Sequence, residues 1–417
     1  MIRKFSCHNY RNIDADGLTF DKINILVGPN NSGKSNFIRA ITFYSNLLKH
    51  PGDGGLKTAF LNGVKRGGWD HIRNKAMRED APVSLQWQMD LDDRLIDFNF
   101  SFIAAKKVED CHIVSETMSD AIDRGYSNPF NYFTCHERNV GKGYISSAVD
   151  IGETNSRIYF DLDSTEVFCR QYKDILLSDS AIYGSNVREK LMVLLEKLES
   201  KFLGMRSYSS ARINIEEMRK PLDPVTKENT LLADASNFIA VFNQYKSESL
   251  QWRRLFLEKM QELDSEITDL DIVIKYDKFG FFIEKENKIT LDFSDVSEGT
   301  LKALVMNLLL NMPQERENFL LAIDEPENNL HPAWQKVIGR WIQESTAFEQ
   351  CFISTHSPDF LDTFTEYFKQ GYVSVFVFDG MNNIRRVTFD MLKEALGDWE
   401  LGDLYRTNDP ALGGWPW

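Results

Sequence analysis

The chain has 417 residues, of which 42% are hydrophobic and 26% are charged, an ordinary balance for a soluble globular protein of roughly two to three domain-sized units. No apolar run reaches the roughly 18 residues of a membrane span, and the first residues lack the apolar core of a secretory signal, so we expect a cytoplasmic protein. The net charge of −14 argues against a chain that coats nucleic acid through bulk electrostatics, because affinity for phosphate backbones comes from Lys and Arg.

Contacts with DNA or RNA, if the chain makes them, must come from local basic patches. Each candidate patch fits an ordinary solvated surface equally well. The candidates are Lys65, Arg66, Arg73, Lys75 and Arg78, then Lys106 and Lys107, Arg219 and Lys220, and Arg253 and Arg254. The five cysteines are scattered without a C-x-x-C pair, which favours buried thiols over a disulfide framework or a zinc finger.

The first recognisable elements are a short apolar strand at 23–27, a glycine-bounded loop at 28–35 and the start of a helix from Asn36. This strand, loop and helix order is the context of a phosphate-binding loop, in which backbone amides and the positive helix end attract an anion. We expect Lys34 to reach the β and γ phosphates and the Ser35 hydroxyl to bind Mg²⁺. The residues expected to surround the phosphates are Gly28, Asn30, Asn31, Ser32, Gly33, Lys34, Ser35 and Asn36.

The middle of the chain is less informative. Residues 51–75 are rich in glycine and predict a loop, while the alternating pattern of 83–103 predicts antiparallel strands. Residues 108–185 yield only one possible strand, at 157–160. Helical spacing at 187–203 and at 237–263 predicts helices that are too short for a long coiled coil.

The second half of the candidate site begins with the apolar run at 319–323, which ends in Asp324 and Glu325. Such a run is typical of a central parallel strand that is covered on both faces. At the strand tip Asp324 can hold the Mg²⁺ shell, and Glu325 is the candidate general base that orients an attacking water.

Two more segments complete the candidate site. Residues 296–300 open a helix whose apolar face is expected at 301, 304, 305, 308 and 309, so that Ser297 and Gly299 lie at its positive end. Residues 351–354 predict another short strand that delivers His356 next to the acidic strand tip, by the strand-end logic of open α/β sheets.

The ordered motifs GPNNSGKS, VSEGT, LLAIDEPENNLHP and STHSP resemble those of the ABC-type ATPase heads of the RecF, SMC and OLD-nuclease group, especially the stand-alone bacterial AAA-type ATPases of defence loci. The resemblance implies an α/β fold: an ABC-ATPase head with a P-loop and a mixed or parallel sheet core, an antiparallel β subdomain and a helical signature lobe, without a long coiled coil. It makes Ser297, Glu298 and Gly299 the signature motif that contacts ATP held by a second subunit. It makes 327–331 the loop that links the two sites and His356 the γ-phosphate switch.

On this basis we expect three parts. Residues 1–105 form the first ATPase lobe with the P-loop and the β subdomain, 106–290 an inserted mixed α/β and helical region, and 291–417 the second lobe with the signature, the acidic strand and His356. The cofactors are ATP and Mg²⁺. Because the resemblance implies a signature motif that acts on a second subunit, the partner is another copy of the chain, in a homodimer or a higher homo-oligomer.

The role of the expected ATPase cycle is a matter of family analogy. Nuclease relatives carry a further metal-binding domain after the ATPase, and the 61 residues after His356 are too few for it. The first hypothesis is therefore an ATPase that regulates a separately encoded effector, with a nuclease as the first candidate, in anti-phage defence. The alternatives are a DNA-repair ATPase of the RecF kind that clamps DNA, and the ATPase subunit of a transporter.

Overall fold

The structure is a computed structural model that describes residues 1–49, 71–78, 80–105, 107, 110–122, 130–136, 140–146, 157–178, 186–223, 228–275, 277–313, 318–380 and 383–412. The chain forms two compact units. The first comprises Met1–Asp21, Pro29–Met205 and Phe378–Arg386, and the second comprises Lys22–Gly28, Arg206–Val377 and Val387–Trp417. Within the described residues, no helix is long and apolar enough to cross a membrane.

The first unit is built on an eight-stranded sheet in the order β2-β1-β4-β5-β6-β7-β8-β9, in which every neighbouring pair is antiparallel. In β4 and β5, buried positions alternate with more exposed ones, which confirms the antiparallel strands expected at 83–103. The strands are β1 (Ile2–Tyr10), β2 (Ile13–Thr19), β4 (Val83–Leu91), β5 (Arg94–Ile103), β6 (His112–Asp120), β7 (Asn131–Cys135), β8 (Lys142–Ser146) and β9 (Arg157–Asp161).

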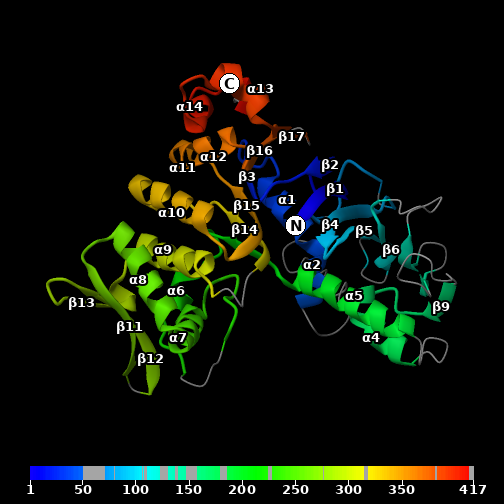
Figure 1. Cartoon of the computed structure of the whole chain (residues 1–417), viewed down its shortest axis with the longest axis horizontal. Helices are drawn as coiled ribbons and strands as arrows, with labels where there is room; N and C mark the ends of the chain where they lie inside the picture. The colour runs from blue at the N-terminus through cyan, green and yellow to red at the C-terminus, as the bar shows by residue number, and fades with distance from the viewer. Residues whose placement is uncertain are drawn as a thin grey trace. The chain divides into compact units, whose positions relative to one another are not determined.

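Aromatic side chains pack helices onto one face of this sheet. The ring of Tyr44 lies 4.8 Å from that of Phe98 and 4.6 Å from that of Phe202, and the indole of Trp87 donates to the Ile41 carbonyl at 3.0 Å. These contacts bury large apolar areas, the main stabilising term in folding. The helices of this unit are α1 (Lys34–Ile41), α2 (Phe43–Lys49), α4 (Phe168–Ser178) and α5 (Asn186–Leu203), the last two lying side by side (Figure 1).

A second sheet has the order β10-β14-β15-β3-β16-β17. Its strands are β10 (Met205–Ser209), β14 (Asn318–Asp324), β15 (Phe348–Ser354), β3 (Ile23–Val27), β16 (Val373–Phe378) and β17 (Ile384–Val387). Strands β14, β15, β3 and β16 are parallel, with Ile25 paired to both Ile353 and Val375. Almost every residue of these four is buried, as expected for a parallel sheet covered on both faces. Strand β17 follows β16 in the chain.

Helices and a small sheet complete the second unit. The three-stranded sheet is β11 (Ile267–Lys275), β12 (Lys278–Lys285) and β13 (Thr290–Asp292). The helices are α6 (Ile215–Met218), α7 (Phe238–Glu248), α8 (Leu250–Leu263), α9 (Glu298–Leu310), α10 (Pro332–Glu344), α11 (Pro358–Asp362), α12 (Thr365–Lys369), α13 (Phe389–Leu396) and α14 (Leu401–Arg406), with short 3₁₀ turns at Phe293–Asp295 and Pro410–Leu412.

Two helices differ from the sequence expectation. The helical stretch at 237–263 is broken at Ser249, whose extended backbone ends α7 and whose hydroxyl accepts from the Trp252 amide to cap α8. Helix α9 is buried along its whole length from Leu301 to Leu310, including Lys302 and Asn307, so it is not the one-sided helix that its apolar spacing suggested. The longest helix in the described part of the chain is α5, with 18 residues, and no long coiled coil is present there. The three sequence ranges expected as domains stay a prediction.

Candidate functional site

The loop before α1 has the backbone shape of an anion cradle. Gly33 lies at φ 112° and Asn31 at φ 64°, both in the left-handed region. The φ of 112° strains any residue with a side chain, and a Cβ atom at Gly33 would lie 2.7 Å from Cδ1 of Ile13, so glycine is favoured there. No side chain caps the start of α1, and the positive end of this helix suits an anion.

Side chains outside the motif brace this loop. The amide of Asn12, in the turn between β1 and β2, donates to the Asn31 carbonyl at 3.3 Å, and the amide of Asn36 donates to Oδ1 of Asn12 at 2.7 Å. Arg11 and Arg39 both donate to Oδ1 of Asn36, at 3.3 and 3.1 Å. Arg11 and Asn12 carried no sequence signal, since they belong to a strand turn far from any motif.

Two polar groups of the loop fit a bound phosphate. The Lys34 ammonium donates to the loop's own Pro29 carbonyl at 2.9 Å. The Ser32 hydroxyl is buried, and the described residues offer it no hydrogen-bond partner. A buried hydroxyl without a partner costs about 1–3 kcal/mol, which a phosphate oxygen would offset. The glycine, the helix start, Lys34 and Ser32 together fit a nucleotide phosphate.

In the second unit, the carboxyl ends of β14, β15 and β3 meet at one edge of the parallel sheet. Asp324 closes β14, and its carboxylate accepts from Ser354 Oγ at 2.5 Å and from Ser209 Oγ at 3.4 Å. Strand β3 is the neighbour of β15 and leads through Gly28 into the loop described above. Such an edge is where open parallel sheets bind ligands.

Glu325 is held in an unusual conformation directly after β14. Its φ of 55° is in the left-handed region, which is uncommon for a residue other than glycine and which concentrates at functional sites. Its amide donates to the carbonyl and the hydroxyl of Ser354, each at 3.1 Å. The carboxylate accepts from the Asn328 side-chain amide at 2.6 Å and lies 3.4 Å from Nε2 of His356. The structure therefore brings Glu325 and His356 together.

The sequence did not suggest the structural role of Glu327. It is buried, and its Oε1 accepts from the Thr355 hydroxyl at 2.8 Å and from the His356 amide at 2.7 Å. Burial raises the pKa of Glu327. Because Glu327 ties the segment after β14 to the segment after β15, it positions His356 within its own chain.

The start of α9 packs against the segment that follows Glu325. The Ser297 hydroxyl caps α9 by accepting from the Thr300 amide at 3.2 Å, and Glu298 accepts from the Asn329 side chain at 3.0 Å. A Cβ atom at Gly299 would lie 2.8 Å from the Asn329 carbonyl oxygen. Lys302 donates to the Asn328 carbonyl at 3.4 Å. Ser297, Glu298 and Gly299 are thus adjacent to the loop that carries Asn328, within one chain.

Several of the predicted basic patches are engaged in contacts within the chain. Arg73 is buried and donates to the Met77 carbonyl, and Arg78 is paired with Asp80. Arg219 donates to the Val296 carbonyl, and Arg253 contacts the carboxylates of Asp269 and Asp271. Lys65, Arg66 and Lys106 lie outside the described residues.

Comparison with known proteins is consistent with this geometry. Residues 1–361 match the family described as AAA ATPase domain. The chain belongs to this family. No curated protein matches the chain.

Three solved structures are similar to this chain. An SMC head bound to the C-winged helix domain of ScpA superposes with a TM-score of 0.53 at 12% identity, covering 94% of this chain and 99% of that one. An SMC head from Thermotoga maritima has a TM-score of 0.42 at 11% identity, covering 93% and 98%. An SMC head of Pyrococcus furiosus with ScpA has a TM-score of 0.47 at 10% identity, covering 95% and 98%. The expected SMC-like ATPase head fold is confirmed by the first of these.

Proposed function

We propose that this chain binds ATP with Mg²⁺ and hydrolyses it in a head-to-tail homodimer. The observation that carries the proposal is the position of the Glu325 carboxylate, 2.6 Å from the Asn328 amide and 3.4 Å from His356, at the sheet edge where β3 ends. A carboxylate oriented by two neighbours is suited to hold a water for attack on a phosphorus atom.

Each residue of the site has a role that follows from its chemistry. Lys34 places a positive charge on the β and γ phosphates, while Ser35 and Asp324 would hold Mg²⁺ through oxygen atoms. Glu325 orients the water and takes its proton, and His356 donates a hydrogen bond toward the γ phosphate. Bound Mg·ATP supplies the phosphorus that is attacked and the metal that neutralises the leaving charge.

The second copy would supply Ser297, Glu298 and Gly299. These residues start α9, whose first amides and positive end suit an anion. The absence of a side chain at Gly299 allows the backbone of α9 to approach Asn329 closely. The start of α9 contacts Asn329 and Asn328, and Asn328 in turn contacts Glu325. Binding of this helix start to a nucleotide held by the second subunit would therefore affect Glu325 of the same chain.

Beyond ATP hydrolysis, we propose that the chain is a RecF/OLD-like ATPase that regulates a separate effector, with a nuclease as the candidate, in anti-phage defence. Support comes from the order of the four motifs. The SMC head that shares this fold was crystallised with a winged-helix domain of another protein, which supports the proposal that such heads bind partner proteins. A protein partner is therefore the first thing to seek, by co-purification with the products of neighbouring genes.

The test is a comparison of the native chain with Glu325→Gln. The variant is expected to bind ATP, to remain dimeric in sedimentation with ATP, and to lose about 10²–10⁴-fold in turnover, the range of a general base. Glu366→Gln, a substitution of a side chain that is 71% exposed, serves as the control and should behave like the native protein. A native chain that stays monomeric in the presence of ATP and still hydrolyses it would contradict the proposal.

A further inference from the structure

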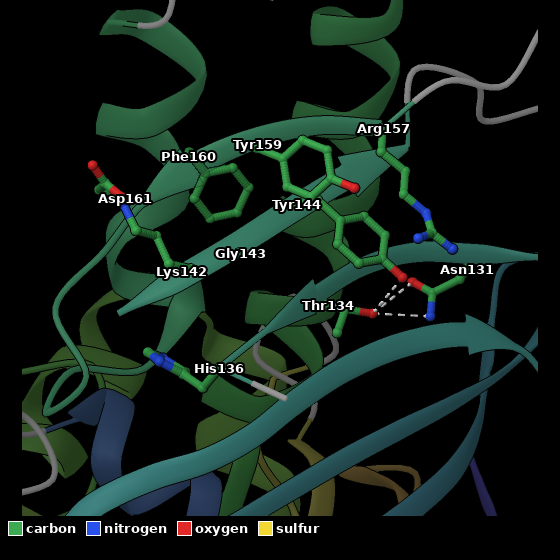
Figure 2. Close-up of a pocket in the computed structure, with 10 residues that line it drawn as sticks. All are labelled: Asn131, Thr134, His136, Lys142, Gly143, Tyr144, Arg157, Tyr159, Phe160 and Asp161. Carbon is green, nitrogen blue, oxygen red and sulfur yellow. Dashed lines mark hydrogen bonds and ion pairs between the residues drawn. The ribbon is translucent and has the colours of Figure 1, made fainter. Parts of the chain in front are cut away.

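The end of the eight-stranded sheet carries a cavity that the ATPase proposal does not use. It has a volume of about 700 Å³ and lies on the face formed by β7, β8 and β9. Figure 2 shows the side chains that line it. Thr134 pairs with Tyr144 across β7 and β8, and Tyr144 pairs with Tyr159 across β8 and β9, so these three side chains form one row.

The two tyrosines form an aromatic surface that is partly open to solvent. Their ring centroids are 5.8 Å apart with the planes tilted by 58°, and Tyr159 is 67% exposed on the edge strand of the sheet. The guanidinium of Arg157 lies 4.6 Å from the centre of the Tyr144 ring. An exposed aromatic ring beside a cation is a favourable stacking surface for a planar ligand.

Hydrogen bonds to its hydroxyl group hold the Tyr144 ring in place. The hydroxyl of Thr134 donates to the Tyr144 hydroxyl at 3.1 Å, and the Asn131 side-chain amide donates to Thr134 Oγ1 at 3.1 Å (Figure 2). This chain of hydrogen bonds orients the ring before a ligand arrives, which reduces the entropy that binding would cost.

One residue of the cavity wall, His136, is buried and neutral. His136 is 97% buried, and its Nδ1 accepts from the Gly141 amide at 3.0 Å, so the neutral ring carries its proton on Nε2. Burial lowers the pKa of His136 to about 4, which keeps the ring neutral at physiological pH. Nε2 has no partner among the described residues. Nε2 is itself buried, so it lies behind the accessible surface of the cavity.

The charges of the cavity favour an anionic ligand. Among the described residues of the wall, Lys142 and Arg157 are basic, and one residue, Asp161, carries a carboxylate, which is paired with Lys142. A locally positive surface is notable in a chain with a net charge of −14.

We propose that this surface, which we call the Tyr144/Tyr159 platform and which also includes Arg157, binds an unpaired nucleobase with its phosphate. The base stacks on the exposed ring of Tyr159, and the phosphate is held by Arg157. The ligand is either part of a single-stranded nucleic acid or a free nucleotide, since both present the same chemistry. The platform lies wholly in the first unit and does not depend on ATP hydrolysis.

The test uses fluorescence anisotropy of the full chain with labelled short oligothymidylate and oligodeoxyadenylate at physiological ionic strength. The variants are Tyr159→Ala and Tyr159→Phe, with Tyr372→Ala as the control because Tyr372 is 60% exposed and lies in the other unit. Tyr159→Ala should weaken binding about 5- to 150-fold, the cost of one lost stacking contact, while Tyr159→Phe and Tyr372→Ala should bind as the native chain does.

The competitors distinguish the two sources of the ligand. Half-displacement of the label by AMP at a concentration near the dissociation constant of AMP itself would assign a free nucleotide, and displacement only by unlabelled oligonucleotide would assign a strand. Absence of binding, binding to a duplex as strong as to a single strand, or equal losses in Tyr159→Phe and Tyr159→Ala would each overturn the proposal. Repeating the assay with Lys34→Ala separates a failure of the platform from a failure of the ATP site.

Discussion

The side-chain amide of Asn328 donates a 2.6 Å hydrogen bond to Oε2 of Glu325, three residues earlier in the chain. The same segment contacts the start of α9, where Lys302 donates to the Asn328 carbonyl and Asn329 donates to Glu298. A continuous set of contacts therefore runs from the start of α9 to the carboxylate that we propose as the general base.

Replacement of Asn328 by Ala should lower turnover more than affinity. The carboxylate of Glu325 would lose a fixed donor worth about 1.5–3 kcal/mol, so we expect kcat to fall about 10- to 100-fold with KM for ATP nearly unchanged. Steady-state kinetics measures both constants. Asn287→Ala, in the exposed turn between β12 and β13, is the matched control. A rise in KM with an unchanged kcat would show that Asn328 acts on binding and not on Glu325.

Replacement of Gly33 by Ala should disable the loop for two separate reasons. Its φ of 112° strains any other residue, and the new Cβ would lie 2.7 Å from Ile13. Gly371→Ala is a control that carries a comparable backbone strain, because Gly371 has φ 76° but open space around it. We expect about 1–2 kcal/mol of destabilisation for Gly371→Ala in urea unfolding and more for Gly33→Ala. Only Gly33→Ala should lose ATP binding in calorimetry, and equal effects of the two substitutions would contradict the packing argument.

The local parts of the site could be predicted from the sequence because each follows from a short pattern. An apolar run before Gly28 and another before Asp324 predict buried parallel strands, and both are present as β3 and β14. Residues that depend on distant partners could not be found in this way. The resemblance places Glu327 in a linking loop and says nothing of its burial, yet it is buried and accepts from Thr355 and His356.

The same reasoning explains why the sequence did not predict the burial of Lys302 in α9 or the contact of Asn12 with the phosphate loop. Apolar spacing predicts which side of a helix is buried, but Lys302 is also buried because the loop after Glu325 covers it. Asn12 braces the phosphate loop from a turn whose sequence is ordinary. Such roles follow from the tertiary fold and leave no periodic signal.

The stability of the first unit should depend on pH through Glu116. This carboxyl is fully buried, accepts from the Tyr44 hydroxyl and the Phe168 amide, and burial raises its pKa to about 7. An acid with a raised pKa keeps its proton in the folded state and loses it in the unfolded state, so its contribution is full below the ordinary glutamate pKa of 4.5 and is lost as the pH rises toward 7. The free energy of unfolding should fall by up to about 1.4 kcal/mol per pH unit in this window.

Urea unfolding of the native chain and of Glu116→Gln at several pH values measures this contribution. The variant should show a flatter dependence between pH 4.5 and 7, because the glutamine amide does not titrate there. Glu366→Gln, which removes an exposed carboxylate, should leave the native slope. Identical slopes in Glu116→Gln and in the native chain would assign the pH dependence to other groups.

Two inactive variants should restore activity when mixed, if the sites are shared between subunits. Lys34→Ala removes the phosphate lysine, and Gly299→Ala places a Cβ 2.8 Å from the Asn329 carbonyl at the start of α9. In a mixed head-to-tail dimer, one site combines both defects, while the other combines the intact loop of one chain with the intact α9 of its partner. Random exchange of subunits should therefore recover about a quarter of the native turnover, provided that the two sites act independently. Turnover is measured after mixing equal amounts of the purified variants, with each variant alone as the control. No recovery in a mixture whose subunit exchange is verified by sedimentation with a labelled chain would argue against independent sites built from two chains.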